Sequence, residues 1–364
     1  MSLTLENLSR KVDGVDHIRE ANLTFEAGSF NVLLGRTLSG KTSLMRLMAG
    51  LDKPTSGRLI YNGKDVTGQS VQKRNISMIY QQFINYPTLT VYDNIASPLR
   101  LARMPTDEID RRVKETAAML RIDTLLKRYP LELSGGQQQR TAMARALVKD
   151  ATLVLFDEPL VNLDYKLREE LRSELRELFK ERNCIAVYAT TEANEALALS
   201  GTTTLLHEGR VVQSGPVMGV YRAPVNTLAA QLFSEPPMNM IHGRVTETEV
   251  TFDEYSHHAL TQDLAKLPPG DYWFGIRPSH TALAPINDDD LEMAMEVELS
   301  EISGSETFMH VQNRHFEMVL QLLGVHRYEE GAPIKVYLPI NKLFVFDSDE
   351  DLVHTPSAIT GGSA

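Results

Sequence analysis

The sequence predicts an α/β unit built on a parallel sheet, followed by a small all-β unit. Short apolar runs alternate with helical patterns up to about residue 233, and a glycine loop separates the first of these runs from its helix. Short β-like runs separated by turns follow the proline-rich segment Glu235-Pro236-Pro237. Strands that alternate with helices form parallel sheets covered on both faces. We therefore expect one α/β domain, a linker near Pro236, and a β domain.

The elements of the α/β unit follow from their apolar patterns. Residues 153–156 are wholly apolar, as expected of a central parallel strand, and residues 111–120 place Val113, Ala117 and Leu120 on one helix face. The predicted strands are 30–34, 153–156 and 185–188; the predicted helices are 42–48, 111–120, 142–147 and 166–180. The β-like runs of the second unit are 272–276, 295–299, 307–311 and 334–338, which suggest a small all-β barrel.

The amino-acid composition excludes some classes of function. Hydrophobic residues make up 42% and charged residues 23% of 364 residues, and the net charge is −11. This acidic balance argues against nucleic acid as a partner. The single cysteine, Cys184, indicates a reducing compartment. The first residues contain no apolar leader segment and no apolar stretch approaches about 20 residues, so we expect any membrane role to come through a partner.

Residues 35–42 fit the pattern G-x-x-x-x-G-K-[ST] between a strand and a helix, which predicts an α/β P-loop NTPase. Glycines let the backbone N–H groups surround phosphates; Lys41 would bind the β- and γ-phosphates and the Thr42 hydroxyl would bind Mg²⁺. A chance glycine turn is the alternative, but the strand and helix on either side argue against it. The predicted ATP-binding residues are Gly35, Arg36, Thr37, Leu38, Ser39, Gly40, Lys41, Thr42 and Ser43.

Two acids follow the apolar run 153–156 and complement the phosphate loop. Asp157 would hold Mg²⁺ through water at the carboxyl end of the strand. Glu158 is placed to polarise the attacking water as a general base. Two solvated acids after a strand are common, but their combination with the loop at Gly35 favours a catalytic role.

A second glycine motif lies between these two segments. Residues 133–140 read LSGGQQQR and precede the helix 142–147, so the paired glycines predict another backbone cradle for an anion. The motif resembles the signature of ABC ATPases, carried here by Ser134, Gly135, Gly136 and Gln137. In that family two subunits face head to tail, and each ATP lies between one subunit's phosphate loop and the other's signature motif. The resemblance implies an ABC ATPase cassette with a helical subdomain at about 88–145.

Further motifs extend the resemblance. Gln81 matches the family's Q-loop glutamine, which touches Mg²⁺ and the attacking water. Asn162, Leu163 and Asp164 match most of the D-loop, although Val161 stands where a serine is usual.

The chain is most similar to the carbohydrate-importer branch of the family. The stretches that carry this likeness are 86–95 and 164–168 in the cassette, and 238–241, 275–278 and 304–307 in the β unit. The likeness implies a cassette at 1–235, an OB-fold-like regulatory domain at 236–350 and a disordered tail at 351–364. It also implies ATP and Mg²⁺ as cofactors, membrane permease subunits as partners, a solute-binding protein as an indirect one, and a peripheral place on the cytoplasmic face of a bacterial inner membrane. Glycerol and glycerol 3-phosphate are examples of the polyol or sugar-like solutes expected.

Two residues of the family pattern are missing. Thr191 occupies the position of a histidine that orients the water on the γ-phosphate, and a threonine hydroxyl cannot carry its positive charge. Val12 falls where an aromatic residue stacks on adenine, and the only ring nearby is His17, which by itself is more often a surface imidazole. Both gaps affect the site on this chain's own phosphate loop, whereas the signature motif is intact. We therefore expect a second, different ATPase subunit as partner.

Two other functions stay open at this point. A catalytically weak subunit that clamps ATP is favoured by Thr191, while the retained Lys41, Asp157 and Glu158 argue against complete inactivity. A soluble ABC ATPase outside transport would need a coiled coil or a second cassette, and the sequence contains neither.

Overall fold

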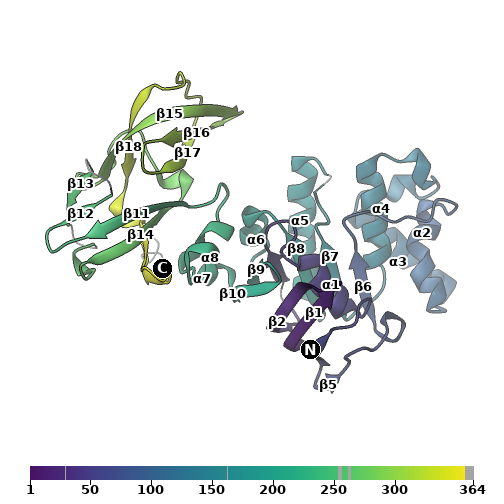
Figure 1. The fold of residues 1–364 in the computed structure, drawn as a ribbon. Helices are drawn as coiled ribbons and strands as arrows, with labels where there is room; N and C mark the ends of the chain where they lie inside the picture. The colour runs from purple at the N-terminus through teal and green to yellow at the C-terminus, as the bar shows by residue number, and fades with distance from the viewer. Residues whose placement is uncertain (29, 162, 253–255, 261–263, 357–364) are drawn as a thin grey trace. The chain divides into compact units, whose positions relative to one another are not determined.

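The computed structural model describes residues 1–28, 30–161, 163–252, 256–260 and 264–356 (Figure 1). The chain forms two compact units, Met1–Val217 and Met218–Ala364. The division falls before the predicted linker, because α7 (Val217–Arg222) and α8 (Thr227–Leu232) bond to the β unit. The Thr227 amide donates to the Glu350 carbonyl at 3.1 Å, and the Arg277 guanidinium donates to the Tyr221 carbonyl at 2.6 Å.

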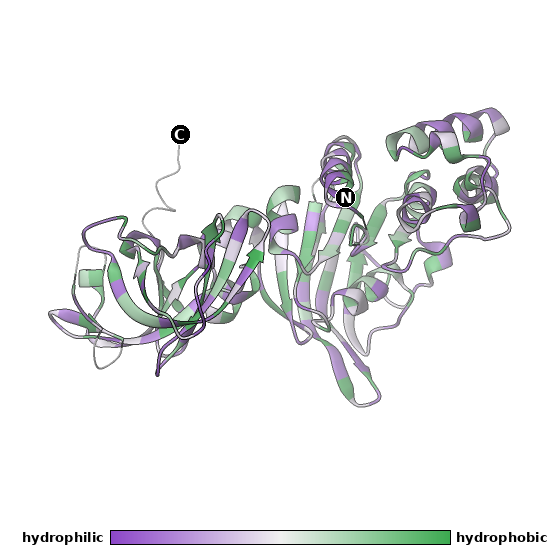
Figure 2. Ribbon diagram, turned by 90° about the horizontal axis from the view of Figure 1, so that it is seen from above, coloured by the Kyte–Doolittle hydropathy of each residue, from purple (hydrophilic) through white to green (hydrophobic). Residues whose placement is uncertain are grey.

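A six-stranded sheet forms the centre of the first unit, with the order β10-β9-β3-β8-β7-β6. Its strands are β3 (Phe30–Leu34), β6 (Ile76–Ile79), β7 (Leu153–Asp157), β8 (Ile185–Thr190), β9 (Thr202–His207) and β10 (Arg210–Pro216). All neighbours pair in parallel except β10, which is antiparallel to β9. Every residue of β3, β7 and β8 is buried, as the apolar runs predict. Figure 2 shows apolar residues concentrated along the strands.

A second, antiparallel sheet of the first unit was not predicted. Its strands are β1 (Ser2–Val12), β2 (Val15–Glu26), β4 (Ser56–Tyr61) and β5 (Lys64–Asp65). Alternation along β1 breaks at Asn7, whose φ is 45° and whose amide donates to the Asn22 side chain. This irregularity hides the strand from a period-two pattern. Helix α1 (Lys41–Ala49) supplies buried Leu44 and Met48 to the core shared by both sheets.

The helical part of this unit contains α2 (Val91–Leu101), α3 (Thr106–Met119) and α4 (Gly135–Leu147), which lie together next to β6 in Figure 1. Helix α4 begins seven residues before the predicted 142. Gly135 and Gly136 therefore form its first turn and do not precede it, because Ser134 caps the helix. Helices α5 (Tyr165–Glu181) and α6 (Ala193–Leu199) complete the unit. No helix within the described ranges is long and apolar enough to cross a membrane.

Two antiparallel sheets make up most of the second unit. One has the order β13-β12-β11-β14-β19-β20 and the other β17-β16-β15-β18. Their strands are β11 (Asn239–Val245), β12 (Glu249–Thr251), β13 (His257–Ala259), β14 (Gly270–Ile276), β15 (Leu291–Ser303), β16 (Glu306–Gln312), β17 (Glu317–Leu323), β18 (Pro333–Leu338), β19 (Phe344–Phe346) and β20 (Leu352–His354). Residues from both sheets share one apolar core, which includes Phe274, Met309 and Leu338. The four predicted β-runs lie within β14, β15, β16 and β18.

The expectation of a disordered tail from 351 is wrong at its start. Strand β20 pairs with β19, and the Leu352 amide donates to the Val225 carbonyl at 3.0 Å. These backbone bonds order the segment despite its polar composition. The remainder of the expected tail, 357–364, lies outside the described residues.

Candidate nucleotide site

The phosphate loop joins β3 to α1 and is too tight for side chains at its two glycines. A Cβ atom at Gly35 would collide with the Leu206 carbonyl oxygen. Gly40 has a φ of 106°, and a Cβ atom there would lie 2.9 Å from the His17 carbonyl oxygen. The Gly35 amide donates to the Thr190 carbonyl at 3.3 Å, which ties the loop to the end of β8. The loop therefore sits at the carboxyl edge of the sheet, against the positive N-terminus of α1.

Lys41 lies buried in the middle of this loop, with 5% of its surface exposed. Its Nζ donates to the carbonyl oxygens of Gly35 at 2.7 Å and Arg36 at 3.1 Å, and lies 3.5 Å from Glu158 Oε1. Burial lowers the pKa of Lys41, and the charge of Glu158 opposes that effect. The ammonium group is thus held at the position where phosphate oxygens are expected.

Thr42 and Asp157, the predicted Mg²⁺ ligands, are in contact beside Lys41. The Thr42 hydroxyl donates to Asp157 Oδ2 at 2.9 Å and lies 3.1 Å from Oδ1. Burial raises the pKa of Asp157, while the Thr42 hydrogen bond opposes the rise. A hydroxyl and a carboxylate are the hard oxygen donors that suit Mg²⁺. The described residues contain no group of three or more His, Cys, Asp or Glu side chains that could hold a metal.

Glu158 and Gln81 face each other next to Lys41. Gln81 Nε2 donates to Glu158 Oε2 at 3.1 Å, and this contact joins the segments after the paired strands β6 and β7. Glu158 has a φ of 47°, and its amide donates to the Ala189 carbonyl at 3.1 Å. A left-handed backbone at a non-glycine residue costs free energy, and the bond to Ala189 helps to hold Glu158 in this conformation. The structure therefore brings together five predicted residues: Gln81, Lys41, Thr42, Asp157 and Glu158.

Other predicted residues lie at the rim of this site. Arg36, Thr37 and Leu38 are exposed at the loop tip, where Leu38 has a φ of 67°. Thr191 is exposed immediately after β8, beside the Thr190 carbonyl that accepts from Gly35. The side chain of the neighbouring Thr190 does not point to the loop. Its hydroxyl donates to the buried carboxylate of Glu195 at 2.6 Å.

Two reciprocal hydrogen bonds between Ser134 and Gln137 close the signature turn. The Ser134 side chain accepts from the Gln137 amide at 3.4 Å, and the Gln137 side chain accepts from the Ser134 amide at 3.0 Å. Ser134 and Gly135 are exposed, and a Cβ atom at Gly135 would meet nothing within 4 Å. Among the residues that the structure describes, no hydrogen bond or ion pair joins this motif to Lys41 or Glu158. The phosphate loop and the signature turn, the two predicted anion cradles, are therefore separate among the described residues.

Asp164 of the D-loop caps the N-terminus of α5. Its Oδ1 accepts from the Leu167 amide at 3.0 Å and starts α5, while Asn162 lies outside the described residues. The neighbouring Leu163 side chain lies 3.3 Å from where a Cβ atom of Gly136 would be. The D-loop segment thus packs beside the signature turn.

Three contacts at the site were missed from the sequence. The buried Gln139 side chain donates to the Pro159 carbonyl and links α4 to the segment after Glu158. The Gly209 amide donates to the Ser39 carbonyl at 2.9 Å, so the β9–β10 turn supports the phosphate loop. Ser43 Oγ lies 3.5 Å from His17 Nδ1. No local pattern marks such pairings, because each joins segments far apart in the chain.

The fold and site define a P-loop nucleotide-binding cassette with a signature motif on a separate helix. The family model described as ABC transporter matches residues 18–161. The chain is 34% identical over 356 residues to the sn-glycerol-3-phosphate import ATP-binding protein UgpC of Escherichia coli O157:H7, covering 95% of this chain and 98% of the relative. It is 36% identical over 350 residues to the trehalose/maltose import ATP-binding protein MalK of Thermococcus litoralis, covering 92% of this chain and 94% of the relative.

Two further similarities bear on the fold and on the solute. The Fe(3+) ions import ATP-binding protein FbpC of Vibrio cholerae is 34% identical over 320 residues, covering 88% of this chain and 90% of the relative. The dimeric post-hydrolysis structure of the ATP-binding cassette MJ0796 bound to ADP and Pi has a TM-score of 0.55 and 28% identity, covering 59% of this chain and 98% of that chain. The chain therefore belongs to the ABC transporter family, as an ATP-binding subunit that hydrolyses ATP.

Proposed function

We propose that this chain powers the import of a polyol or sugar-like solute by hydrolysing Mg-ATP on its phosphate loop. The observation that carries the proposal is the continuous set of contacts from Thr42 and Asp157 through Lys41 and Glu158 to Gln81. The groups that would hold phosphate and metal, and the carboxylate that would polarise water, are thus in mutual contact, which supports the proposal.

Each residue has a role set by its contacts. Residues 35–43 would surround the phosphates, and Thr42, Asp157 and Gln81 would hold Mg²⁺. The Glu158 carboxylate would take the proton of the attacking water, while Gln81 keeps that carboxylate oriented. The signature turn at Ser134 would close over the ATP of a facing subunit, because its exposed helix start is suited to bind phosphate oxygens.

The solute and partners follow from the relatives. UgpC and MalK are named for glycerol 3-phosphate and trehalose/maltose import, which supports a polyol or sugar-like solute such as glycerol or glycerol 3-phosphate. We propose membrane permease subunits as direct partners and a solute-binding protein as an indirect one, with the chain on the cytoplasmic face of a bacterial inner membrane. Residues 236–350 would act as an OB-type regulatory domain, an assignment supported by their two packed antiparallel sheets.

Uptake by the purified transporter in vesicles tests this function. Labelled glycerol, glycerol 3-phosphate, maltose and Fe(3+) are offered separately with ATP on the side of this subunit. We expect ATP-dependent uptake of a polyol or sugar, and no uptake with Lys41→Ala. Uptake of iron alone would overturn the solute class; iron is included because FbpC has the same 34% identity to the chain as UgpC. Uptake that survives Lys41→Ala would overturn the site.

We also propose that the facing subunit is a different ATPase. Thr191, exposed beside the loop, offers no charge to the γ-phosphate, whereas the signature turn is complete. A partner with its own histidine would form a competent site against Ser134, and the site on Lys41 would act mainly as an ATP clamp. Counting the ATPase polypeptides of the purified transporter tests this pairing. Two copies of this chain with normal turnover would refute it.

A further inference from the structure

A cavity of about 230 Å³ lies between the antiparallel sheet and the central sheet of the first unit. Its lining includes Met48 in the last turn of α1, and Ile76 and Leu153, the first residues of β6 and β7. Helix α1 begins at the phosphate loop, and β7 ends at Asp157. The cavity therefore lies at the opposite ends of these elements and shares no lining residue with the nucleotide site.

The walls of this cavity are largely apolar, and its charged groups are all cations. Lys73 and Arg74 line it, and no Asp or Glu among the described residues does so. The apolar lining residues are Leu3, Met48, Tyr61, Val66, Ile76 and Leu153. Binding sites for small molecules combine apolar walls with a few fixed polar groups, and these cations would favour an anionic end on the ligand.

Hydrogen bonds to the backbone hold the Arg74 guanidinium in place. Its Nη1 donates to the Met48 carbonyl at 2.7 Å, and its Nη2 donates to the Val66 carbonyl at 2.5 Å. Its Nε is buried and, among the described residues, has no hydrogen-bond partner. Burial lowers the pKa of Arg74, and within the described ranges no carboxylate opposes that effect. Since buried charges are ordinarily paired, this fixed cation lacks the anion that would complete it.

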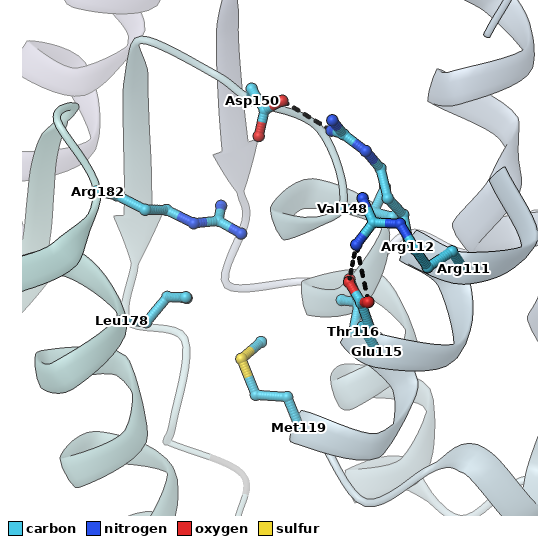
Figure 3. Close-up of a pocket in the computed structure, with 9 residues that line it drawn as sticks. All are labelled: Arg111, Arg112, Glu115, Thr116, Met119, Val148, Asp150, Leu178 and Arg182. Atoms are coloured by element: carbon cyan, nitrogen blue, oxygen red, sulfur yellow. Dashed lines mark hydrogen bonds and ion pairs between the residues drawn. The ribbon is translucent and has the colours of Figure 1, made fainter. Parts of the chain in front are cut away.

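A larger cavity of the same unit, about 320 Å³, shows the contrast (Figure 3). Three arginines line it, and two of them are bonded to acids that line it as well. Arg111 donates to Glu115 at 2.8 Å, and Arg112 donates to Asp150 at 2.7 Å. In that cavity the positive charge is mostly neutralised within the chain, whereas the cavity beside Arg74 has no acid in its lining.

We propose that the cavity beside Arg74 binds a small molecule with an apolar body and one carboxylate. The carboxylate would accept hydrogen bonds from Arg74, and the apolar body would pack against Met48 and Ile76. A single charge suits the site, because the apolar walls would leave any further charge without solvent or partner. This site goes beyond the proposed function and does not depend on the nucleotide.

Calorimetric titration of the full-length chain with hexanoate tests the proposal. Hexanamide has the same body without the charge, and acetate has the charge without the body. We expect hexanoate to bind with a Kd on the order of 1 mM or tighter, and the other two probes to bind roughly tenfold more weakly or worse. Arg74→Gln should weaken hexanoate binding by a similar factor. Arg182→Gln is the matched control: Arg182 lines the cavity of Figure 3 and donates to the Leu147 carbonyl at the end of α4, so hexanoate affinity should not change.

A second variant keeps the bond from Arg74 to the end of α1. Val66→Phe fills the cavity and leaves the guanidinium intact, so it should abolish hexanoate binding while the far-ultraviolet circular dichroism stays unchanged. Unchanged hexanoate affinity in Val66→Phe, or equal affinities for hexanoate and hexanamide, would overturn the proposal. Tighter binding of hexyl phosphate than of hexanoate would overturn the carboxylate assignment. Lys41→Ala should bind hexanoate normally; weaker binding there would place the probe in the phosphate loop and would also overturn the proposal.

Discussion

The two anion cradles of this chain differ in how they are supported. The phosphate loop is connected over long sequence distances, through Lys41 to Glu158 and through Thr42 to Asp157. The signature turn at Ser134 is capped within four residues and is exposed. The first cradle is in contact with the predicted catalytic groups of the same chain, whereas the second presents only a helix start. Under the proposed function, the second cradle would need another molecule to supply the rest of a site.

The largest expected difference between the two cradles is in how their substitutions change ATP affinity. Lys41→Ala removes charge-assisted bonds to phosphate worth roughly 1.5–3 kcal/mol each, so ATP affinity of the isolated chain should fall at least tenfold. Gly135→Asp should leave that affinity unchanged, because Gly135 contacts no part of the phosphate loop. Equilibrium titration with Mg-ATP measures both variants. Equal losses would contradict the separation of the two cradles.

A smaller difference between the two cradles is expected in stability, because their glycines differ in backbone strain. Gly40→Ala would impose a φ of 106° on alanine and a clash with His17, so we expect stability of the first unit to fall by roughly 1–3 kcal/mol. Gly135→Ala has open space and a helical backbone, and should be neutral or slightly stabilising. Chemical denaturation of the two variants checks this. A stable Gly40→Ala chain would mean that the loop can relax.

The smallest effect concerns pH. Burial raises the pKa of Asp157 above its ordinary 3.8, so the native state binds this proton more tightly than the unfolded chain does. The stability this provides is present at low pH and is lost as pH rises through the raised pKa. Asp157→Asn should therefore raise the thermal midpoint of the nucleotide-free chain near neutral pH, while weakening the Mg²⁺ dependence of ATP binding.

Asp52 is the matched control for this prediction. The hydrogen bond that Arg46 donates at 2.8 Å lowers the pKa of Asp52. The stability that the ionised Asp52 provides is therefore lost as pH falls. Asp52→Asn should lower the stability of the protein at neutral pH. Thermal scans of both variants against pH would show opposite signs. A lower midpoint for Asp157→Asn near neutral pH would contradict the role of burial.

Local sequence patterns predicted the three middle strands of the central sheet, β3, β8 and β7, but not β6, β9 or β10. The strand at 30–34 and the strand ending at Asp157 lie where apolar runs predict them, because a parallel strand buried on both faces has little freedom in composition. The antiparallel sheet was missed, since Asn7 interrupts its alternation. The β20 pairing was missed as well, because Leu352 is ordered by backbone bonds that composition does not reveal.

The site was predictable to the extent that its groups lie in contiguous motifs. Lys41, Asp157 and Glu158 each stand in such a motif, and the fold then places them together. The Gln139 contact with Pro159 and the Gly209 support of Ser39 join distant segments, so only the three-dimensional structure shows them. The sequence shows that His17 has a ring. Only the three-dimensional structure shows the bulge at His17 and its contact with Ser43 beside the phosphate loop.

ATP turnover of the assembled transporter tests the central claim most directly, with Glu158→Gln and Gly135→Asp introduced separately into this chain. Gly135→Asp keeps an open helix start but turns a carboxylate toward the partner's phosphates. If this chain lends its signature turn to a competent partner site, Gly135→Asp should lower turnover on the order of a hundredfold. Glu158→Gln should then lower it far less. A loss from Glu158→Gln that equals or exceeds the loss from Gly135→Asp would contradict the account.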